Sequence, residues 1–193
     1  MTTQKASYAV NLFYSYSHKD SRYREDMEKS LALLKRNGIL SQWSDRSIMP
    51  GRSISDEIRL NMEKAQIFVF LLSPDFIASE ECMKEWREAK DMASENRSIF
   101  RIPIIVRNCS WKDLLKGDDL KALPEDGEPV FNFLNQDEAW EQVYEGVKLV
   151  TSELRNTFSV KGSFLDEMER TDFISEQHIR LQDIYIFPRL ICQ

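Results

Sequence analysis

The hydrophobic positions along the chain change period several times, and the order of these changes predicts the fold. Five short apolar or alternating segments predict β-strands, at residues 8–16, 39–43, 66–72, 99–106 and 130–134. Four longer segments repeat apolar residues every three or four positions, which predicts amphipathic helices at 20–37, 53–65, 79–96 and 137–158. The segment 66–72 is apolar throughout, as in a strand covered on both faces. This alternation predicts a doubly wound α/β fold, with five mostly parallel strands and helices on both faces of the sheet.

Local signals at the ends of these segments agree with the periodicity. Asn37-Gly38 ends the first helix with residues that tolerate the left-handed conformation of a C-terminal cap. Asp20 and Ser53 stand where the first and second helices begin, and both are residue types that cap helix N-termini. Pro103 lies inside the fourth strand and lacks an N–H donor, so it predicts a β-bulge or an edge strand.

The character of the sequence changes at Ser159. We therefore expect one domain over residues 1–158 and a C-terminal extension or linker over 159–193, with a short acidic helix at 164–170. The chain stops inside an apolar stretch, 179–192, although chain termini are usually polar and exposed. This favours a longer protein, in which residues 159–193 begin a following module.

Composition limits the class of protein. The 193 residues include 26 Lys+Arg and 32 Asp+Glu, a formal net charge of −6. This acidic balance argues against a nucleic-acid-binding surface, which needs a basic surplus to neutralise phosphates. Hydrophobic residues make up 42% of the chain, enough for a sizeable core, and this excludes disorder of the whole chain.

The cysteines and the N-terminus indicate a reduced, cytoplasmic location. The three cysteines, Cys82, Cys109 and Cys192, are far apart, and with only two histidines in the chain they predict no metal site. The N-terminus lacks the basic and apolar regions of a signal peptide. The longest apolar run, 67–72, is far shorter than the ~20 residues that cross a membrane, so we expect no membrane contact.

Five motifs stand in order on this alternation of strands and helices. They are FYSYSHKD at 13–20, WSDRSIMPG at 43–51, SPDFIASEECMKEW at 73–86, PIIVRNCSW at 103–111 and ALP at 122–124. In this order and spacing they resemble a TIR (Toll/interleukin-1 receptor) domain of the bacterial type found in defence proteins, over roughly residues 8–157. The resemblance implies the flavodoxin-like TIR fold. Neither a P-loop nor a dinucleotide-binding GxGxxG motif occurs in the sequence.

The resemblance implies two functional classes, which the fold alone does not separate. Some TIR domains are adaptors that assemble through TIR–TIR contacts. Others cleave NAD+ at the nicotinamide–ribose bond, using one glutamate in a C-x-x-E pattern on the helix after the third strand. Cys82-Met83-Lys84-Glu85 matches that pattern, so the resemblance makes Glu85 the catalytic candidate. The alternative is that Glu85 is one solvated carboxylate of an acidic helix.

A single carboxylate suffices for this chemistry. The nicotinamide of NAD+ is cationic and leaves without being protonated, so the second carboxyl group of an ordinary glycosidase is dispensable. The ribose develops an oxocarbenium-like charge as the bond breaks, and a fixed carboxylate stabilises that charge. We therefore expect NAD+ as a substrate, with no separate cofactor.

The resemblance also implies which residues contact NAD+: Tyr16, Ser17, Trp43, Asp45, Arg46 and Cys82. Tyr16 would offer an aromatic face and Ser17 a hydroxyl group. For Asp45 and Arg46, a local surface ion pair is an equally good interpretation. One position departs from the family, because many relatives have an aromatic residue four positions before the catalytic glutamate and this chain has Glu81.

Our first hypothesis is an NAD+ glycohydrolase or cyclase, activated by clustering with other TIR domains, that serves as the effector of a bacterial antiviral protein. The alternative is a non-enzymatic scaffold that signals by TIR–TIR contact through loop 44–51 and the neighbouring helices. A receiver-like protein would need several acidic residues after the first strand, where the sequence has only Asp20. The stretch 179–190 resembles the entry to an NTPase sensor module of the NACHT or related STAND kind.

Overall fold

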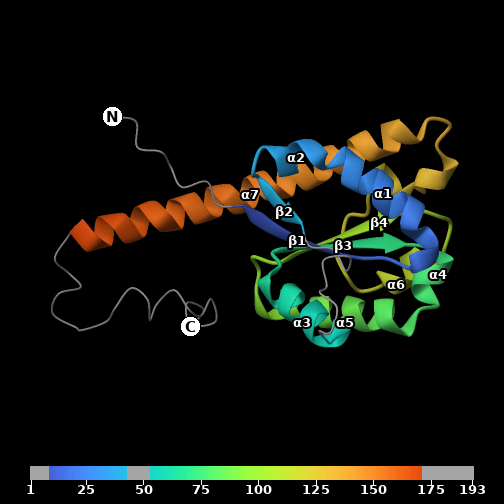
Figure 1. The fold of residues 1–193 in the computed structure, drawn as a ribbon, viewed down its shortest axis with the longest axis horizontal. Helices are drawn as coiled ribbons and strands as arrows, with labels where there is room; N and C mark the ends of the chain where they lie inside the picture. The colour runs from blue at the N-terminus through green and yellow to red at the C-terminus, as the bar shows by residue number, and fades with distance from the viewer. Residues whose placement is uncertain (1–8, 43–52, 171–193) are drawn as a thin grey trace. The chain divides into compact units, whose positions relative to one another are not determined.

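The computed structural model describes residues 9–42 and 53–170, and within them it contains a parallel β-sheet of four strands. The strands are β1 (Val10–Ser15), β2 (Leu40–Gln42), β3 (Ile67–Leu72) and β4 (Phe100–Ile105), in the spatial order β2-β1-β3-β4 (Figure 1). The register pairs Leu12 with Ile67, and Ile67 with Phe100. The predicted α/β fold with a parallel sheet is confirmed.

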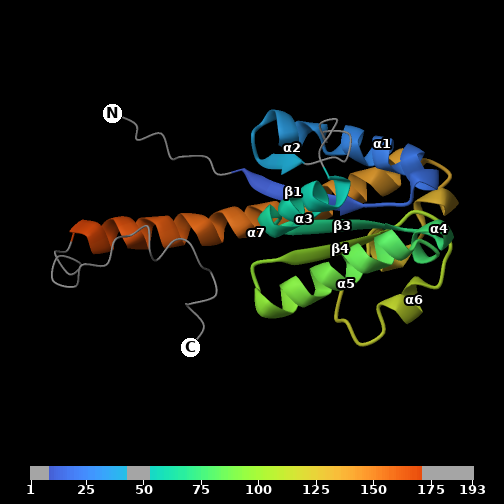
Figure 2. The ribbon, with the colours of Figure 1, turned by 60° about the horizontal axis from the view of Figure 1, so that its bottom comes forward.

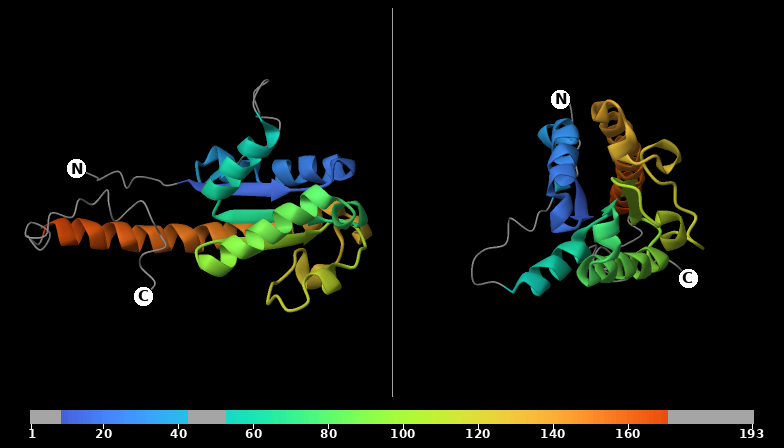
Figure 3. Two further views of the ribbon diagram at one scale, coloured as in Figure 1. Left: turned by 90° about the horizontal axis from the view of Figure 1, so that it is seen from below. Right: turned by 90° about the vertical axis from the view of Figure 1, so that its right-hand side faces the viewer.

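The helices and the turns between the strands account for most of the other described residues. The α-helices are α1 (Ser21–Ser30), α2 (Ala32–Arg36), α3 (Ile54–Lys64), α4 (Pro74–Ile77), α5 (Glu80–Glu95), α6 (Trp111–Leu114) and α7 (Gln136–Arg170). Three 3-10 helices are also present in the described residues: η1 (His18–Asp20), η3 (Glu125–Gly127) and η4 (Val130–Asn132). Helices α1 and α2 lie on one face of the sheet, and α3 and α5 lie on the other (Figures 1 and 3).

The chain divides into two units by its contacts, residues 1–151 and 152–193. The first unit contains the sheet, every helix from η1 to η4, and the beginning of α7. The described part of the second unit is the remainder of α7, up to Arg170.

Strand β3 is the centre of the hydrophobic core. All six of its residues are buried, as the unbroken apolar run predicts for a strand covered on both faces. Alternate residues serve the two faces, and Phe68, Phe70 and Leu72 belong to the cluster that includes Trp86 of α5. The rings of Phe70 and Trp86 meet edge to face at a centroid distance of 4.7 Å. The same face of the sheet therefore fixes the position of α5, which runs beside the strands in Figure 2.

The predicted fifth strand at 130–134 is wrong. Val130–Asn132 forms the 3-10 helix η4 instead, and Phe131 donates one backbone hydrogen bond to Val106, beyond the end of β4. Leu123 occupies the free edge of β4: its N–H donates to the carbonyl of Pro103 and its carbonyl accepts from Ile105, both at 2.8 Å. Pro103 has no N–H to offer on that outer side, so β4 is a poor partner for a full strand. The edge-strand prediction for Pro103 is confirmed among the described strands.

Two helix predictions also need correction. The single helix expected at 20–37 is divided into α1 and α2 at Leu31, where the hydroxyl of Ser30 bonds to the carbonyl of Met27 at 2.9 Å and competes with the backbone ladder. The last helix does not end at 158, because α7 continues to Arg170 and includes the acidic helix expected at 164–170. The caps at Gly38, with φ +64°, and at Ser53, which accepts from the N–H of Asp56, are confirmed.

Gly127 is the glycine whose replacement we expect to cost most stability. Its φ is +69°, and an added Cβ would lie 2.3 Å from the ring of Trp111. Gly127→Ala therefore combines left-handed strain with a steric clash, and we expect it to lower the free energy of unfolding by about 2–4 kcal/mol in urea titrations. Gly117→Ala is the matched control, since Gly117 has φ +87° with no atom near the new Cβ, and it should cost only about 1 kcal/mol. Equal losses in the two variants would contradict the role given to Trp111.

Candidate functional site at the carboxyl edge of the sheet

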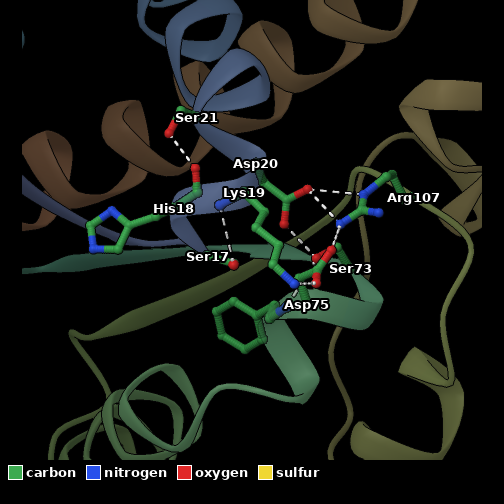
Figure 4. A network of polar contacts seen from close by, with 9 residues as sticks. Ser17, His18, Lys19, Asp20, Ser21, Ser73, Asp75 and Arg107 are labelled. Carbon is green, nitrogen blue, oxygen red and sulfur yellow. Dashed lines mark hydrogen bonds and ion pairs between the residues drawn. The ribbon is translucent and has the colours of Figure 1, made fainter.

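Polar side chains gather where β1, β3 and β4 end. Because the strands are parallel, their carboxyl ends meet at one edge of the sheet, which is where doubly wound folds bind ligands. The turn η1 follows β1, Ser73 and α4 follow β3, and Arg107 follows β4. Figure 4 shows the side chains of Asp20, Ser73, Asp75 and Arg107, which come from these three segments, pointing toward one another.

The carboxylate of Asp20 is the centre of this polar network. It is 1% exposed, and it accepts from the hydroxyl of Ser73 at 2.5 Å and from Nε of Arg107 at 2.9 Å. Arg107 also donates to Asp75, which in turn accepts from Nζ of Lys19 at 2.7 Å (Figure 4). Two carboxylates and two cations balance in charge, so a buried acid is compensated without a metal ion.

The pairing of opposite charges shifts the pKa values of Asp75 and Arg107. Hydrogen bonds from Lys19 and then Arg107 lower the pKa of Asp75 below its ordinary value. The same pairing, chiefly with Asp75, raises the pKa of Arg107. Both shifts favour the charged forms of Asp75 and Arg107, and the ion pair between them holds the segments after β3 and β4 together.

Asp20 does not cap helix α1, which corrects the role that its position suggests. It occupies the residue before Ser21, but its side chain makes no capping hydrogen bond there. The carboxylate turns inward to Ser73 and Arg107 instead. Sequence reasoning missed Ser73, Asp75 and Arg107 as partners, although all three lie within three residues after the end of a predicted strand, which was the available signal.

Glu85 lies on α5, which covers the face of the sheet opposite to α1. Its side chain is partly buried, one helical turn after Cys82. Cys82 is 5% exposed and belongs to the hydrophobic core, and its N–H is capped by the hydroxyl of Ser79. Burial raises the pKa of the Cys82 thiol, and the nearby charge of Glu85 raises it further. Cys82 is thus a packed core residue that lies beside Ser15 at the end of β1, and Glu85 follows it one helical turn later.

Tyr16 and Ser17, the two described candidates in the first motif, have local partners. The ring of Tyr16 lies 5.9 Å from the rings of Tyr14 and His18, and the guanidinium of Arg24 lies 5.7 Å from its centre. Ser17 caps η1 by accepting from the N–H of Lys19 at 3.4 Å. These contacts place Tyr16 beside α1, whereas Cys82 and Glu85 lie on α5.

The remaining predicted site residues lie in the second motif and on the exposed side of α5. Trp43, Asp45 and Arg46 lie outside the described residues, so their roles stay predictions. Glu81 is exposed and accepts a hydrogen bond from the hydroxyl of Ser79 at 3.2 Å. Where many relatives have an aromatic ring, this chain therefore has a carboxylate that is hydrogen-bonded to Ser79, the N-cap residue of its own helix.

Within residues 9–42 and 53–170, no helix combines the length and the apolar character of a membrane span. In the same part of the chain, no three His, Cys, Asp or Glu side chains are grouped so that they could hold a metal ion.

Comparison with known proteins finds relatives over most of the chain. The family described as TIR domain matches residues 12–143. The uncharacterised protein y4lF of Sinorhizobium fredii (strain NBRC 101917 / NGR234) is 37% identical over 150 residues, which make up 77% of this chain and 46% of that protein. The human Toll-like receptor 1 is 36% identical over 73 residues, or 38% of this chain and 9% of the receptor.

A solved structure also matches. The crystal structure of the TIR domain of the Toll-related receptor TRR-2 from Hydra magnipapillata aligns with a TM-score of 0.48 at 18% identity, covering 71% of this chain and 97% of that one. Among the sequence relatives, the chain spans about half the length of y4lF and a small part of the human receptor.

The parallel sheet, the helices on both faces and the polar residues at its carboxyl edge define an α/β domain of the doubly wound class. Within that class, the chain belongs to the TIR domain family.

The Asp20 network predicts a large effect of a nearly isosteric substitution. Asp20→Asn removes the charge that pairs with Arg107 inside the protein, and we expect a loss of about 2–4 kcal/mol of unfolding free energy by urea denaturation. Lys19→Ala is the control from the same network, because Lys19 is 76% exposed and should contribute within about 0.5 kcal/mol. A loss for Asp20→Asn no larger than that for Lys19→Ala would show that the buried pair is not the stabilising element.

The lowered pKa of Asp75 predicts a pH dependence. Because its pKa is lower in the folded than in the unfolded state, Asp75 stabilises the fold above the unfolded value of about 4 and loses this effect as the pH falls through the folded value. The difference in unfolding free energy between wild type and Asp75→Asn should therefore be present at neutral pH and shrink below about pH 4. Urea titrations across this range measure it, and a difference that grows on acidification would reverse the assigned sign.

Proposed function

We propose that this TIR domain cleaves NAD+ at the nicotinamide–ribose bond, with Glu85 as the catalytic carboxylate. The observation that carries the proposal is that Glu85 is partly buried on α5, one turn after the core residue Cys82, whose thiol lies beside Ser15 at the end of β1. The C-x-x-E pattern at Cys82–Glu85 and the membership of the TIR family support it.

The chemistry needs little more than a fixed negative charge. The bond between C1′ of the ribose and the nicotinamide nitrogen breaks, its electron pair goes to the nitrogen, and neutral nicotinamide leaves. The carboxylate of Glu85 stabilises the oxocarbenium-like ribose as it forms. A water then adds to C1′ and releases a proton to solvent, giving ADP-ribose, or a ring nitrogen of the adenine adds instead and gives a cyclic product.

The other candidate residues would bind the nucleotide around this centre. We assign Tyr16, Ser17, Trp43, Asp45, Arg46 and Cys82 to the NAD+ site. Of these, Cys82 acts through packing, because it is buried in the core behind Glu85. Tyr16 would need to exchange its contact with Arg24 for one with the nucleotide.

We further propose the setting in which this activity operates. The domain would be a cytoplasmic effector of bacterial antiviral defence that is activated when TIR domains associate with one another. Residues 1–158 would form the effector and 159–193 would lead into an NTPase or sensor module. The much longer relative y4lF, of which this chain spans 46%, supports a multidomain protein.

A second candidate function is a non-enzymatic scaffold. The segment 131–134, which runs from η4 toward α7, favours it, because Phe131 is 61% exposed and Leu134 is fully exposed. Apolar side chains exposed this close together in sequence suit a contact with a second copy of the chain. The two candidates differ in whether NAD+ is consumed.

The proposed activity predicts that Glu85→Gln abolishes NAD+ consumption without altering the melting temperature. The substitution keeps the size of the side chain and removes the charge that stabilises the transition state, so a loss of at least about 100-fold is expected. The measurement is the disappearance of NAD+ and the appearance of nicotinamide by chromatography, with concentrated protein or protein clustered on beads.

The control variant is Glu88→Gln on the same helix, which removes an exposed carboxylate that lies 3.8 Å from Lys84. It should consume NAD+ at the wild-type rate. Consumption by Glu85→Gln would refute the assignment of the catalytic residue. A folded, clustered wild-type protein that self-associates and leaves NAD+ intact would favour the scaffold.

A further inference from the structure

The hydroxyl group of Ser15 is a buried polar group without a regular hydrogen bond. Ser15 is the last residue of β1 and is 2% exposed, and its Oγ has no partner of hydrogen-bonding geometry in the described part of the chain. A buried hydroxyl in this state destabilises a fold by about 1–3 kcal/mol, and most buried polar groups avoid it. The surroundings of Ser15 should therefore explain why its hydroxyl is left without a regular hydrogen bond.

The location of Ser15 is the site proposed above. Residues alternate along β1, so Ser15 lies on the same face as Phe13, which belongs to the core cluster beneath α5. Tyr14 lies on the other face, where its hydroxyl donates to Glu28 of α1. The side chain of Ser15 is therefore directed toward α5, at the edge of the sheet where β1 ends.

The neighbour of Ser15 on α5 is Cys82. The hydroxyl is near enough to lower the pKa of the Cys82 thiol, the same thiol whose pKa the charge of Glu85 raises. A thiol is a weak hydrogen-bonding group, so this contact leaves the hydroxyl largely unsatisfied. Glu85 is three residues further along the helix and so lies on the same side of α5 as Cys82.

We propose that Ser15 is a positioning residue of this site, whose hydroxyl donates a hydrogen bond to the carboxylate of Glu85 and holds it ionised and oriented. The inference rests on the function proposed for Glu85. Hydrogen bonds of this kind are often long in a ligand-free site and tighten when substrate binds. In this proposal the hydroxyl lacks a regular partner in the free protein because its partner is the carboxylate in the substrate complex. The unsatisfied hydroxyl slightly lowers the free energy of unfolding.

Within residues 9–42 and 53–170, the charged and titratable groups near this part of α5 come from several elements. Strand β1 carries none, and Arg101 of β4 stacks on Trp86 with its guanidinium 5.5 Å from the ring. On α5 itself, Glu81 and Cys82 are the titratable neighbours, and Asp75 of α4 is held by Lys19 and Arg107. Ser15 is a neutral donor on the strand that faces this side of α5, and it would act on Glu85 together with the contacts that Glu85 already has.

The test compares Ser15→Ala with Ser15→Thr, which restores the hydroxyl, and with Ser30→Ala as a matched control on α1. For Ser15→Ala we expect kcat for NAD+ to fall roughly tenfold with KM nearly unchanged, and the acid limb of the pH–rate profile to move up by about one pH unit. Its melting temperature should equal or exceed that of wild type, because an unsatisfied hydroxyl has been removed. Ser15→Thr should recover much of the rate, and Ser30→Ala should match wild type.

A second readout separates this inference from the proposed function. The titration of the Glu85 carboxyl group, followed by the NMR signal of its carboxyl carbon, should have its midpoint at higher pH in Ser15→Ala than in wild type. If the wild-type protein consumes no NAD+, the proposed function fails, and this midpoint alone decides whether Ser15 acts on Glu85. Identical midpoints in the two proteins, or an unchanged pH–rate profile in an active Ser15→Ala variant, would overturn the inference.

Discussion

The carboxylate of Asp20, buried and shared between Ser73 and Arg107, is the interaction on which the rest of this edge of the molecule depends. It joins the segments that follow β1, β3 and β4, because Ser73 and Arg107 lie 53 and 87 residues after Asp20 in sequence and meet it only because the strands are parallel. A buried carboxylate is stable only when it is paired, so the positions of Ser73 and Arg107 are fixed together with that of Asp20. The turn that carries Ser17 and His18 is held in place by the same interaction.

The hydrophobic core performs the equivalent task for α5. Phe70 and Trp86 meet edge to face, Arg101 covers the ring of Trp86, and Cys82 fills the first turn of the helix beside the end of β1. Glu85 comes from the same helix surface that carries these buried residues, so its carboxylate is positioned by packing. The two faces of the sheet hence have distinct roles: α1 and its ion pairs hold Tyr16, and α5 holds Glu85. A ligand that contacts both residues must lie across the carboxyl edge of β1.

The proposed activity and the state of Ser15 fit one physical picture. Cleavage of a glycosidic bond to a cationic leaving group requires one well-oriented negative charge in a site of low polarity. It does not require an acid–base pair. In the proposed site, packing around Cys82 would supply the low polarity, and the buried hydroxyl of Ser15 would supply the orientation. The free energy of unfolding lost through that unsatisfied hydroxyl is small compared with the free energy gained by burying β3.

The sequence by itself determined the order of the four parallel strands and of the long helices between them, the buried central strand, the caps at Gly38 and Ser53, the edge character of β4 and the family. Each of these depends on local periodicity or on the chemistry of a few adjacent residues. It also singled out Glu85 and Cys82 as a pair, since both lie on one short helical stretch. Only the tertiary structure decided that 130–132 is a 3-10 helix, because the edge of β4 is occupied by Leu123, which is about twenty residues away from it in the chain. The same holds for Asp20, whose sequence position suggests a helix cap and whose carboxylate instead meets Arg107, 87 residues later. Local sequence specifies which residues can form a strand, a helix or a cap, but the partner of a buried charge or of a free strand edge is set by which distant segments the packed sheet brings together.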